Sequence, residues 1–403
     1  MGKTVSWCLV CLFMLTARSP GQITLKFFGM HINHREEHGW PDFPFGTYRL
    51  WDSKTNWYQI NPQKGTYDWT VLDRRLKDAQ EHGVDVVYTF GKTPRWASSL
   101  PDDRQTCLES AGSCGPPSDL KEDGTGPDQY WKDFVTAIAK HAAGRIQFWE
   151  LWNEPFNAGY WKGTFAQMVR MAKDAREIIK SIDPNATVLT PSGGLKVDRA
   201  KVWFRQYLAA GGGQYADGIA FHAYVEHPEK IASFMSEFKQ ILTENGQSSK
   251  PMFDTEGSWG DTAAITDPTS VISRLLILQA SEGVSRVVWY SWDNRKLGNL
   301  WTPEEGSKPA AKTYQLLQDW LIGATFDGPC QPKEDIWTCD LRKNDGAYRA
   351  RIVWSSKPEA NATYSVPEGY VNQRDLSGST TPLKGRNVTI SNRPVLLERP
   401  GAK

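Results

Sequence analysis

The sequence predicts an α/β fold: a (β/α)8 TIM barrel over residues 22–322 and a small C-terminal β-sandwich over residues 323–403. Three observations lead to this prediction. A chain of 403 residues is long enough for a barrel and a second, smaller domain. Strand-like runs alternate with helix-like segments, which is typical of a parallel sheet. After residue 321 the helical periodicity ends, and short alternating runs separated by Gly, Pro and Asn follow.

Eight strand-like runs fall within the predicted barrel. They are 25–31, 47–52, 84–90, 146–152, 188–191, 218–224, 252–256 and 287–293. Between them apolar residues recur at helical spacing, as in Val71, Leu72, Leu76 and Ala79. The longest insertion, Ala97 to Pro127, follows the third run, so we expect it on the face of the barrel that carries active sites.

Composition argues against several classes of partner. The chain has 47 Lys plus Arg against 46 Asp plus Glu and no basic or acidic tail, so we expect no nucleic-acid partner. Mean hydropathy is −0.52, and beyond the N-terminus no apolar run reaches the roughly 18 residues of a membrane span. The 18 Trp are unusual, and so many large rings suggest flat surfaces that a ligand can contact.

The N-terminus has the pattern of a secretory signal peptide over residues 1–21. A short positive region precedes an apolar stretch from Val5 to Ala17, and small residues follow it. The alternative is a membrane anchor, but this stretch of about 13 residues is short for one. We therefore expect a secreted or periplasmic protein that leaves the membrane once the signal is removed.

Four cysteines remain after the predicted signal and allow three pairings. Loops between near neighbours cost the least entropy to close, so we expect the disulfides Cys107–Cys114 and Cys330–Cys339 in an oxidising compartment. A zinc site is the alternative, but no CxxC or paired-His spacing accompanies these cysteines. Sequons for N-glycosylation begin at Asn185, Asn361 and Asn387.

Carboxylates stand at the ends of two predicted strands. The fourth run ends in Trp152-Asn153-Glu154-Pro155, and the seventh ends at Glu256. A lone Glu at a strand end is commonly a salt-bridge partner. Two carboxylates that face each other across a barrel mouth can instead divide the cleavage of an acetal, one as acid and one as nucleophile.

The segment Glu150-Leu151-Trp152-Asn153-Glu154-Pro155 resembles the acid/base motif of the clan A glycoside hydrolases, whose catalytic carboxylates lie at the ends of strands four and seven. With the predicted β-sandwich, the chain looks most like glycoside hydrolase family 39 and its exopolysaccharide-degrading relatives, and family 5 is next. The resemblance implies a retaining O-glycoside hydrolase that acts on β-linked oligo- or polysaccharides without a metal or other cofactor.

The resemblance also implies roles for individual residues. Glu154 is the expected acid/base, Glu256 the expected nucleophile, and Asn153 the expected partner of the 2-hydroxyl of the sugar. Arg49, on the second run, could hold Glu256 ionised, and its alternative is a structural pair with Glu150 or Asp52. On this reasoning the pKa of Glu154 should be raised, while Glu256 stays ionised.

The sixth and eighth runs carry further candidates. His222 and Tyr224 stand two residues apart, so both can face inward, with Tyr224 on the nucleophile and His222 orienting the nucleophile or the substrate. The alternative is a packed core pair. On the eighth run we favour Trp292 over Trp289 as the ring beneath the reacting sugar.

Aromatic residues follow most of the predicted strands. They are Trp40, Trp57, Trp96, Tyr160, Trp161, Trp259 and Trp301, and we expect Trp96, Trp161 and Trp259 to bind substrate. Rings spread around the barrel mouth favour an open groove and internal cleavage of a chain. The alternatives are rings that only hold the long loops, and an exo-acting β-glycosidase.

Two other function classes compete with a glycoside hydrolase. A catalytically silent carbohydrate-binding barrel would be expected to lack one of the two carboxylates, and both are present. A metal-dependent deacetylase or lyase needs His and Asp ligands at several strand ends, where only His222 is well placed. For the β-sandwich we expect structural support rather than glycan binding, because Trp337 and Trp354 lie within apolar runs.

Overall fold

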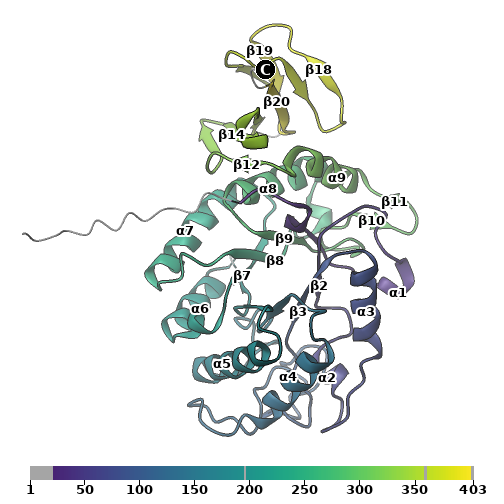
Figure 1. Cartoon of the computed structure of the whole chain (residues 1–403), viewed down its shortest axis with the longest axis vertical. Coiled ribbons are helices and arrows are strands. Elements are labelled where there is room, and N and C mark those ends of the chain that lie inside the picture. Colours follow the sequence, from purple (N-terminus) through teal and green to yellow (C-terminus); the bar gives the residue numbers. More distant parts are fainter. Residues whose placement is uncertain (1–20, 195–196, 358–360, 401–403) are drawn as a thin grey trace, which may run out of the picture.

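The computed structural model describes residues 21–194, 197–357 and 361–400. The predicted signal peptide lies outside these residues apart from Gly21. The described chain forms a closed α/β body with a β-rich body beside it (Figure 1). Within these ranges no helix is both long and apolar enough to cross a membrane.

A parallel sheet forms the centre of the larger body. Its strands are β1 (Phe28–Met30), β2 (Thr47–Leu50), β3 (Asp85–Thr89), β4 (Phe148–Glu150), β5 (Thr187–Leu189), β6 (Gly193–Gly194), β7 (Ile219–Tyr224), β8 (Met252–Ser258) and β9 (Arg286–Trp289). Their order is β5-β4-β3-β2-β1-β9-β8-β7-β6. A parallel bridge from Leu189 to Gly218 joins β5 to the start of β7, so the sheet curls into a barrel.

Each of the eight predicted runs overlaps one of these strands, and the predicted barrel fold is confirmed. The strands are mostly shorter than the runs. Residues Leu25–Phe27 form a 3-10 turn because the Thr24 hydroxyl accepts a hydrogen bond from the Lys26 amide. The short strand β6 was not predicted, since two glycines carry no strand signal.

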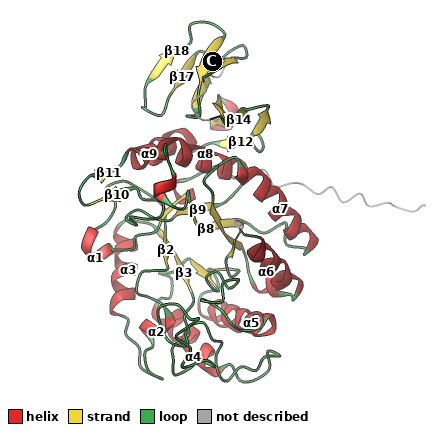
Figure 2. Cartoon of the chain, turned by 180° about the vertical axis from the view of Figure 1, so that it is seen from behind, coloured by secondary structure: helices red, strands yellow, loops and turns green. Residues whose placement is uncertain are grey.

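Helices surround the barrel (Figure 2). They are α1 (Arg35–His38), α2 (Trp57–Ile60), α3 (Thr70–Glu81), α4 (Gln129–His141), α5 (Phe165–Ile182), α6 (Asp198–Ala209), α7 (Lys230–Glu244), α8 (Pro268–Ser281) and α9 (Pro309–Leu321). Helix α8 begins at an Asp267 cap and is buried at every position from Ser270 to Ser281. The β-rich body covers the face that the barrel leaves open, where Ser270 donates to Asn392 O and Ser281 accepts from the Cys330 amide.

The C-terminal body is antiparallel. One sheet contains β12 (Thr325–Phe326), β13 (Gln331–Lys333), β14 (Ile336–Lys343), β15 (Tyr348–Ser355), β17 (Asn372–Arg374), β18 (Thr380–Pro382) and β20 (Val395–Pro400), and β16 (Ala362–Ser365) pairs with β19 (Asn387–Ile390). Val353, Val366, Val388, Ile390 and Leu397 form the core between them. The predicted β-sandwich is therefore present. A separate hairpin, β10 (Trp301–Thr302) and β11 (Gly306–Ser307), precedes α9.

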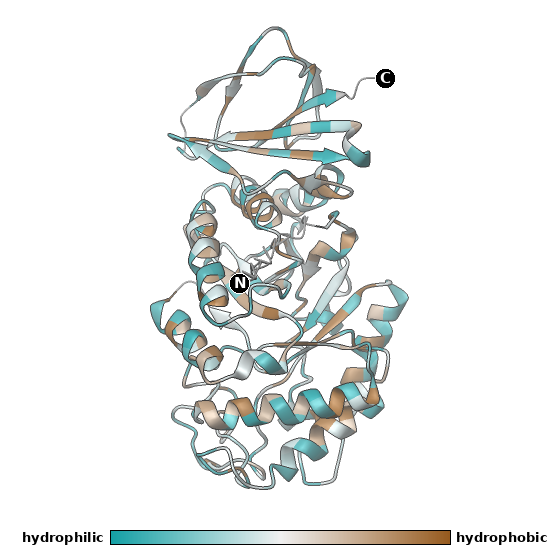
Figure 3. Ribbon diagram, turned by 60° about the vertical axis from the view of Figure 1, so that its left-hand side comes forward, coloured by the Kyte–Doolittle hydropathy of each residue, from teal (hydrophilic) through white to brown (hydrophobic). Residues whose placement is uncertain are grey.

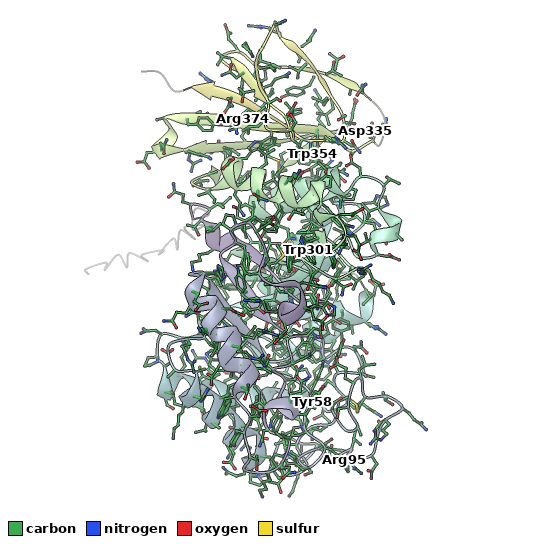
Figure 4. The ribbon with its side chains drawn as sticks, turned by 90° about the vertical axis from the view of Figure 1, so that its right-hand side faces the viewer. Tyr58, Arg95, Trp301, Asp335, Trp354 and Arg374 are labelled. Carbon is green, nitrogen blue, oxygen red and sulfur yellow. A yellow bond between two sulfur atoms is a disulfide. The ribbon has the colours of Figure 1, made fainter. Side chains whose placement is uncertain are left out.

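The sandwich rests on the barrel beside α8 and α9 (Figure 3). Trp354 is fully buried, stacks on Trp337 with ring centroids 6.0 Å apart, and donates from Nε1 to Glu229 Oε1 at 2.9 Å. Figure 4 labels Trp354 where the two bodies meet. Arg393 pairs with Asp267, the cap of α8, at 2.9 Å. These contacts agree with a supporting role for the sandwich.

Both expected cysteine pairs are bonded, Cys107 to Cys114 and Cys330 to Cys339. The first bond closes a loop inside the long insertion. The Leu108 amide donates to Gly159 O at 3.0 Å, so this loop lies against the segment that follows β4. The insertion is therefore on the face of the barrel where the strands end, as predicted.

We expect Trp354→Ala to lower the free energy of unfolding by about 3–5 kcal/mol, because it empties a fully buried site and leaves Glu229 without the indole N–H. Denaturant unfolding measures the loss. Val371→Ala, at a position 45% exposed in the same sandwich, is the control and should change stability by less than about 0.5 kcal/mol. Equal effects of the two variants would contradict a supporting role for Trp354.

Candidate active site

Glu154 follows β4 in an unfavourable backbone conformation. Its φ of 41° lies in the left-handed region, which costs a non-glycine residue about 1–2 kcal/mol. Its amide donates to Ser192 Oγ at 3.1 Å, and Pro155 follows directly. Strain of this kind concentrates at functional sites, where the surrounding structure maintains it.

The carboxylate of Glu154 contacts His222 of β7. His222 Nδ1 lies 2.9 Å from Glu154 Oε1, and the imidazole is almost fully buried while the Glu154 side chain is 22% exposed. His222 Nε2 points to Glu150, with Oε1 at 3.9 Å. The prediction that His222 faces inward is correct, but its hydrogen-bond partner is Glu154 rather than Glu256.

Glu256 lies within β8 at an irregularity of the strand. The register between β8 and β9 shifts between Asp254 and Gly257, and such a bulge redirects the side chains beside it. Gly257 is needed there because a Cβ would lie 2.4 Å from Asp254 Oδ2. The Glu256 carboxylate accepts from Arg49 Nη1 at 2.7 Å and from the Tyr224 hydroxyl at 2.6 Å. Both contacts were expected from the sequence.

Arg49 connects three acceptors with one buried guanidinium. Its Nε donates to Glu150 Oε2 at 2.6 Å, Nη1 to Glu256 Oε2, and Nη2 to Asn153 Oδ1 at 2.8 Å. Thr89 and Thr255 donate further hydrogen bonds to Glu150 at 2.7 and 2.8 Å. Arg49 therefore makes both of the contacts that were considered as alternatives, one with Glu256 and one with Glu150.

The two carboxylates lie close together. Glu154, His222 and Glu256 each offer an atom that could bind a metal, and these atoms are within 4.8 Å of one another. Arg49 already donates to the Glu256 carboxylate, and its positive charge would repel a divalent cation. The donor set therefore fits proton transfer better than metal binding. A second group, Asp103 with Cys107 and Cys114, offers no thiolate because the cysteines are bonded to each other.

The charges of the site couple its pKa values. Burial raises the pKa of Glu154, but the hydrogen bond and charge of His222, with the charge of Arg49, outweigh it and hold that pKa below its ordinary value. Burial, together with the charge of Glu154, raises the pKa of Glu256. Burial lowers the pKa of His222, yet the charges of Glu256 and Glu154 outweigh it and raise that pKa above 6.5.

The expected division of pKa values was therefore wrong. The contact between His222 and Glu154 was not expected, and it lowers the pKa of Glu154 where a raised pKa was predicted. The pKa directions instead favour a proton on His222 over one on Glu154.

Several predicted ring positions are buried instead of facing a ligand. Trp57 and Trp259 have no exposed surface, Trp161 is 4% exposed, and Trp292 is 2% exposed and stacks on Trp301. Trp96 is partly buried, with Nε1 bonded to Asn61 O and its ring edge against Tyr130. These rings fill space between the loops and the barrel, so they do not form the expected row of sugar platforms.

Sequence reasoning missed residues that surround the two carboxylates. Tyr290, rather than Trp292, lies beside Tyr224, with ring centroids 6.4 Å apart, and its hydroxyl donates to Asp52 Oδ2 at 2.6 Å. Lys92 lies 3.9 Å from Asp52. Asp52 ends the second run and Lys92 stands two residues after the third, so their position at strand ends was the signal that could have identified them. Asp52 was considered only as a structural partner of Arg49.

No protein-family model and no curated protein matches the chain. Solved structures do match over nearly the whole chain. A glucosidase from Croceicoccus marinus is 14% identical with a TM-score of 0.63, covering 96% of this chain and 98% of that one. A GH30 endoxylanase from Clostridium papyrosolvens is 13% identical with a TM-score of 0.61, covering 95% and 98%. A GH51 arabinofuranosidase from Xanthomonas axonopodis pv. citri is 10% identical with a TM-score of 0.58, covering 95% and 98%.

These likenesses establish a shared fold, a TIM barrel with an additional β-domain. The resemblance to glycoside hydrolase family 39 stays a prediction.

We expect Arg49→Ala to destabilise the protein by about 3–5 kcal/mol at neutral pH, because it leaves Glu150 and Glu256 buried without their cation. The loss should shrink as pH falls, since protonation neutralises both carboxyls. Denaturant unfolding at several pH values measures it. Arg295→Ala removes an exposed pair with Glu304 and should cost about 1 kcal/mol or less. A pH-independent loss in Arg49→Ala would contradict this account.

Proposed function

We propose that the protein is a retaining O-glycoside hydrolase, with Glu154 as acid/base and Glu256 as nucleophile. The observation that carries the proposal is the pair of carboxylates of Glu154, after β4, and Glu256, in β8, which have oxygen atoms within 4.8 Å and different partners. His222, which can hold a proton, contacts Glu154, while a guanidinium and a phenol contact Glu256. The glucosidase and the endoxylanase of the same fold add support.

The separation of the carboxylates favours retention of anomeric configuration. Retaining enzymes hold the two groups about 5–5.5 Å apart, whereas inverting enzymes leave about 6.5–9.5 Å for a water molecule. One oxygen of Glu154 lies within 4.8 Å of one oxygen of Glu256, and this close approach agrees with the shorter separation.

In the first step Glu256 attacks the anomeric carbon, and the bond from that carbon to the leaving oxygen breaks. His222 Nδ1 passes its proton to Glu154 through the 2.9 Å contact, and Glu154 delivers this proton to the leaving oxygen and remains as a carboxylate. Arg49 and Tyr224 orient the attacking carboxylate. In the second step Glu154 removes a proton from water, the water oxygen bonds to the anomeric carbon, and Glu256 leaves.

Asn153 is oriented for substrate binding by the same guanidinium. Its Oδ1 accepts from Arg49 Nη2, so the amide NH2 is the end left to donate. We propose that it donates to the 2-hydroxyl of the sugar, an interaction that strengthens as the transition state forms.

The proposed substrate is a β-linked oligo- or polysaccharide outside the cell, and the two disulfides agree with an oxidising compartment. Internal cleavage was inferred from rings around the barrel mouth, and the burial of Trp57, Trp161 and Trp259 weakens that support, so both internal cleavage and trimming from chain ends stay open. An early fall in the viscosity of a polymeric substrate identifies internal cleavage, and early monosaccharide release identifies trimming.

We expect wild-type protein to release a product that keeps the anomeric configuration, observed by proton NMR before mutarotation. Glu256→Gln should lower kcat at least about a thousandfold, because it removes the nucleophile. Glu154→Gln should slow the cleavage of substrates with poor leaving groups by about 10²–10⁴. It should largely spare activated aryl glycosides, because their leaving groups need little protonation. Glu305→Gln, 66% exposed and paired with Lys308, is the control. An inverted product, or exchanged behaviour of the two variants, would contradict the assignment.

The dependence of kcat/KM on pH should be bell-shaped. The rising limb of the profile reports the ionisation of Glu256. Because the pKa of Glu256 is raised, the midpoint of this limb should lie above pH 4.5, the ordinary value for a glutamate. The falling limb reports the loss of the proton that His222 and Glu154 share. Because the pKa of His222 is raised, the midpoint of this limb should lie above pH 6.5, the ordinary value for a histidine. His222→Asn should move the falling limb to lower pH. An unmoved falling limb would show that His222 does not hold the transferred proton.

A further inference from the structure

Glu109 comes from the loop that the Cys107–Cys114 disulfide closes, yet it reaches the barrel. It forms an ion pair with Lys92, which follows β3, and Lys92 Nζ also lies 3.9 Å from Asp52 Oδ1, after β2. Lys92 and Glu109 both have left-handed backbones, with φ of 63° and 70°. Two strained residues that meet in one ion pair suggest a position maintained for function. We call Asp52 and Glu109 the acidic rim.

The acidic rim exposes negative charge and covers the positive charge. The Lys92 side chain is only 2% exposed and its Nζ lies over the Trp51 ring, 4.4 Å from the centroid. The side chains of Asp52 and Glu109 are 31% and 44% exposed. A ligand that approaches this part of the barrel therefore meets carboxylate oxygens, not the ammonium group.

The acidic rim adjoins the proposed catalytic centre. Asp52 accepts from the Tyr290 hydroxyl, and Tyr290 lies beside Tyr224, the partner of Glu256. Burial raises the pKa of Tyr160, and the charges of Glu256, Asp52, Glu154 and Glu109 raise it further, so all four carboxylates act on this phenol.

The cation Arg199 acts on Glu154 from another direction. It belongs to α6, which follows β6, and the sheet order places β6 across the closed barrel from β2. Arg199 therefore lies on the side of the barrel away from the acidic rim. Tyr58, labelled in Figure 4, belongs to the side of the acidic rim, where burial and a hydrogen bond to Glu109 raise its pKa to about 12.

We propose that the acidic rim is a sugar-binding subsite that selects neutral or amino sugars and rejects uronates. Carboxylates accept hydrogen bonds from sugar hydroxyls and pair with an ammonium group, whereas a uronate brings a like charge against Asp52 and Glu109. The disulfide restrains the loop that carries Glu109. This inference rests on the proposed glycoside hydrolase function and specifies its substrate class.

The test compares three forms of one β-linked oligosaccharide that wild-type protein cleaves: unmodified, oxidised to carboxylates at the 6-positions, and the methyl ester of the oxidised form. Wild-type kcat/KM should be at least about tenfold lower for the oxidised form than for its uncharged ester. Glu109→Gln should reduce the ratio of kcat/KM for the ester to kcat/KM for the oxidised form by about fivefold. Salt at 1 M should reduce this ratio in wild-type protein by a similar factor, because it screens partly exposed charges. Asp102→Asn, in the same insertion and paired with Arg95, should leave it unchanged.

Equal cleavage of the oxidised form and its ester, or equal effects of Glu109→Gln and Asp102→Asn, would overturn the acidic rim as a selective subsite while the hydrolase proposal stands. Failure of wild-type protein to cleave any glycoside would instead overturn the hydrolase proposal. The acidic rim is then tested by calorimetric binding of cello-oligosaccharides and of their oxidised forms, with the same two variants. Tighter binding of the neutral form that Glu109→Gln reduces supports it, and equal binding overturns it.

The disulfides supply a matched comparison. Replacing Cys107 and Cys114 together by Ser should raise KM for the unmodified oligosaccharide, because Glu109 is no longer restrained. Replacing Cys330 and Cys339 by Ser removes the bond in the sandwich and should not change KM. Circular dichroism confirms that both variants are folded before KM is measured. An equal rise of KM in both would show that the first disulfide has no special relation to substrate binding.

Discussion

A single buried guanidinium organises the centre of this protein. Arg49 on β2 reaches Glu150 on β4, Glu256 on β8 and Asn153 after β4, so its contacts join strands from opposite sides of the barrel. Removing such charges from water costs several kcal/mol per ion, and only complete pairing offsets that cost. The planar, always charged guanidinium meets the requirement, since it donates in several fixed directions at once. The positions of the other polar groups at the centre follow from its geometry.

The same network gives two chemically similar carboxylates different surroundings. Glu256 receives a guanidinium and a phenol, while Glu154 receives an imidazole and keeps part of its surface exposed. His222 is buried among Glu150, Glu154 and Glu256, which favours its protonated form. The site therefore stores a proton beside one carboxylate and holds the other in place, and the division arises from neighbours rather than from residue type.

The abundant tryptophans serve packing more than recognition in the described chain. Trp152 and Trp161 meet edge to face, Trp337 and Trp354 stack, and Trp292 lies on Trp301. Large loops and a sandwich beside the barrel leave wide gaps, and an indole fills such a gap with few rotatable bonds. The polar groups that surround the site come instead from strand ends and from the disulfide-closed loop.

The sequence by itself determined the order of strands and helices, the barrel, the β-sandwich, the cysteine pairs and the strand-end positions of Glu154 and Glu256, because periodicity, spacing and motif are local properties. It also indicated that Arg49 and Tyr224 would reach Glu256. Only the tertiary structure decided that His222 contacts Glu154, that the Tyr290 hydroxyl donates to Asp52, and that Glu109 reaches Lys92. These contacts join residues 17 to 238 positions apart through loop and barrel geometry, and no local pattern encodes such distances.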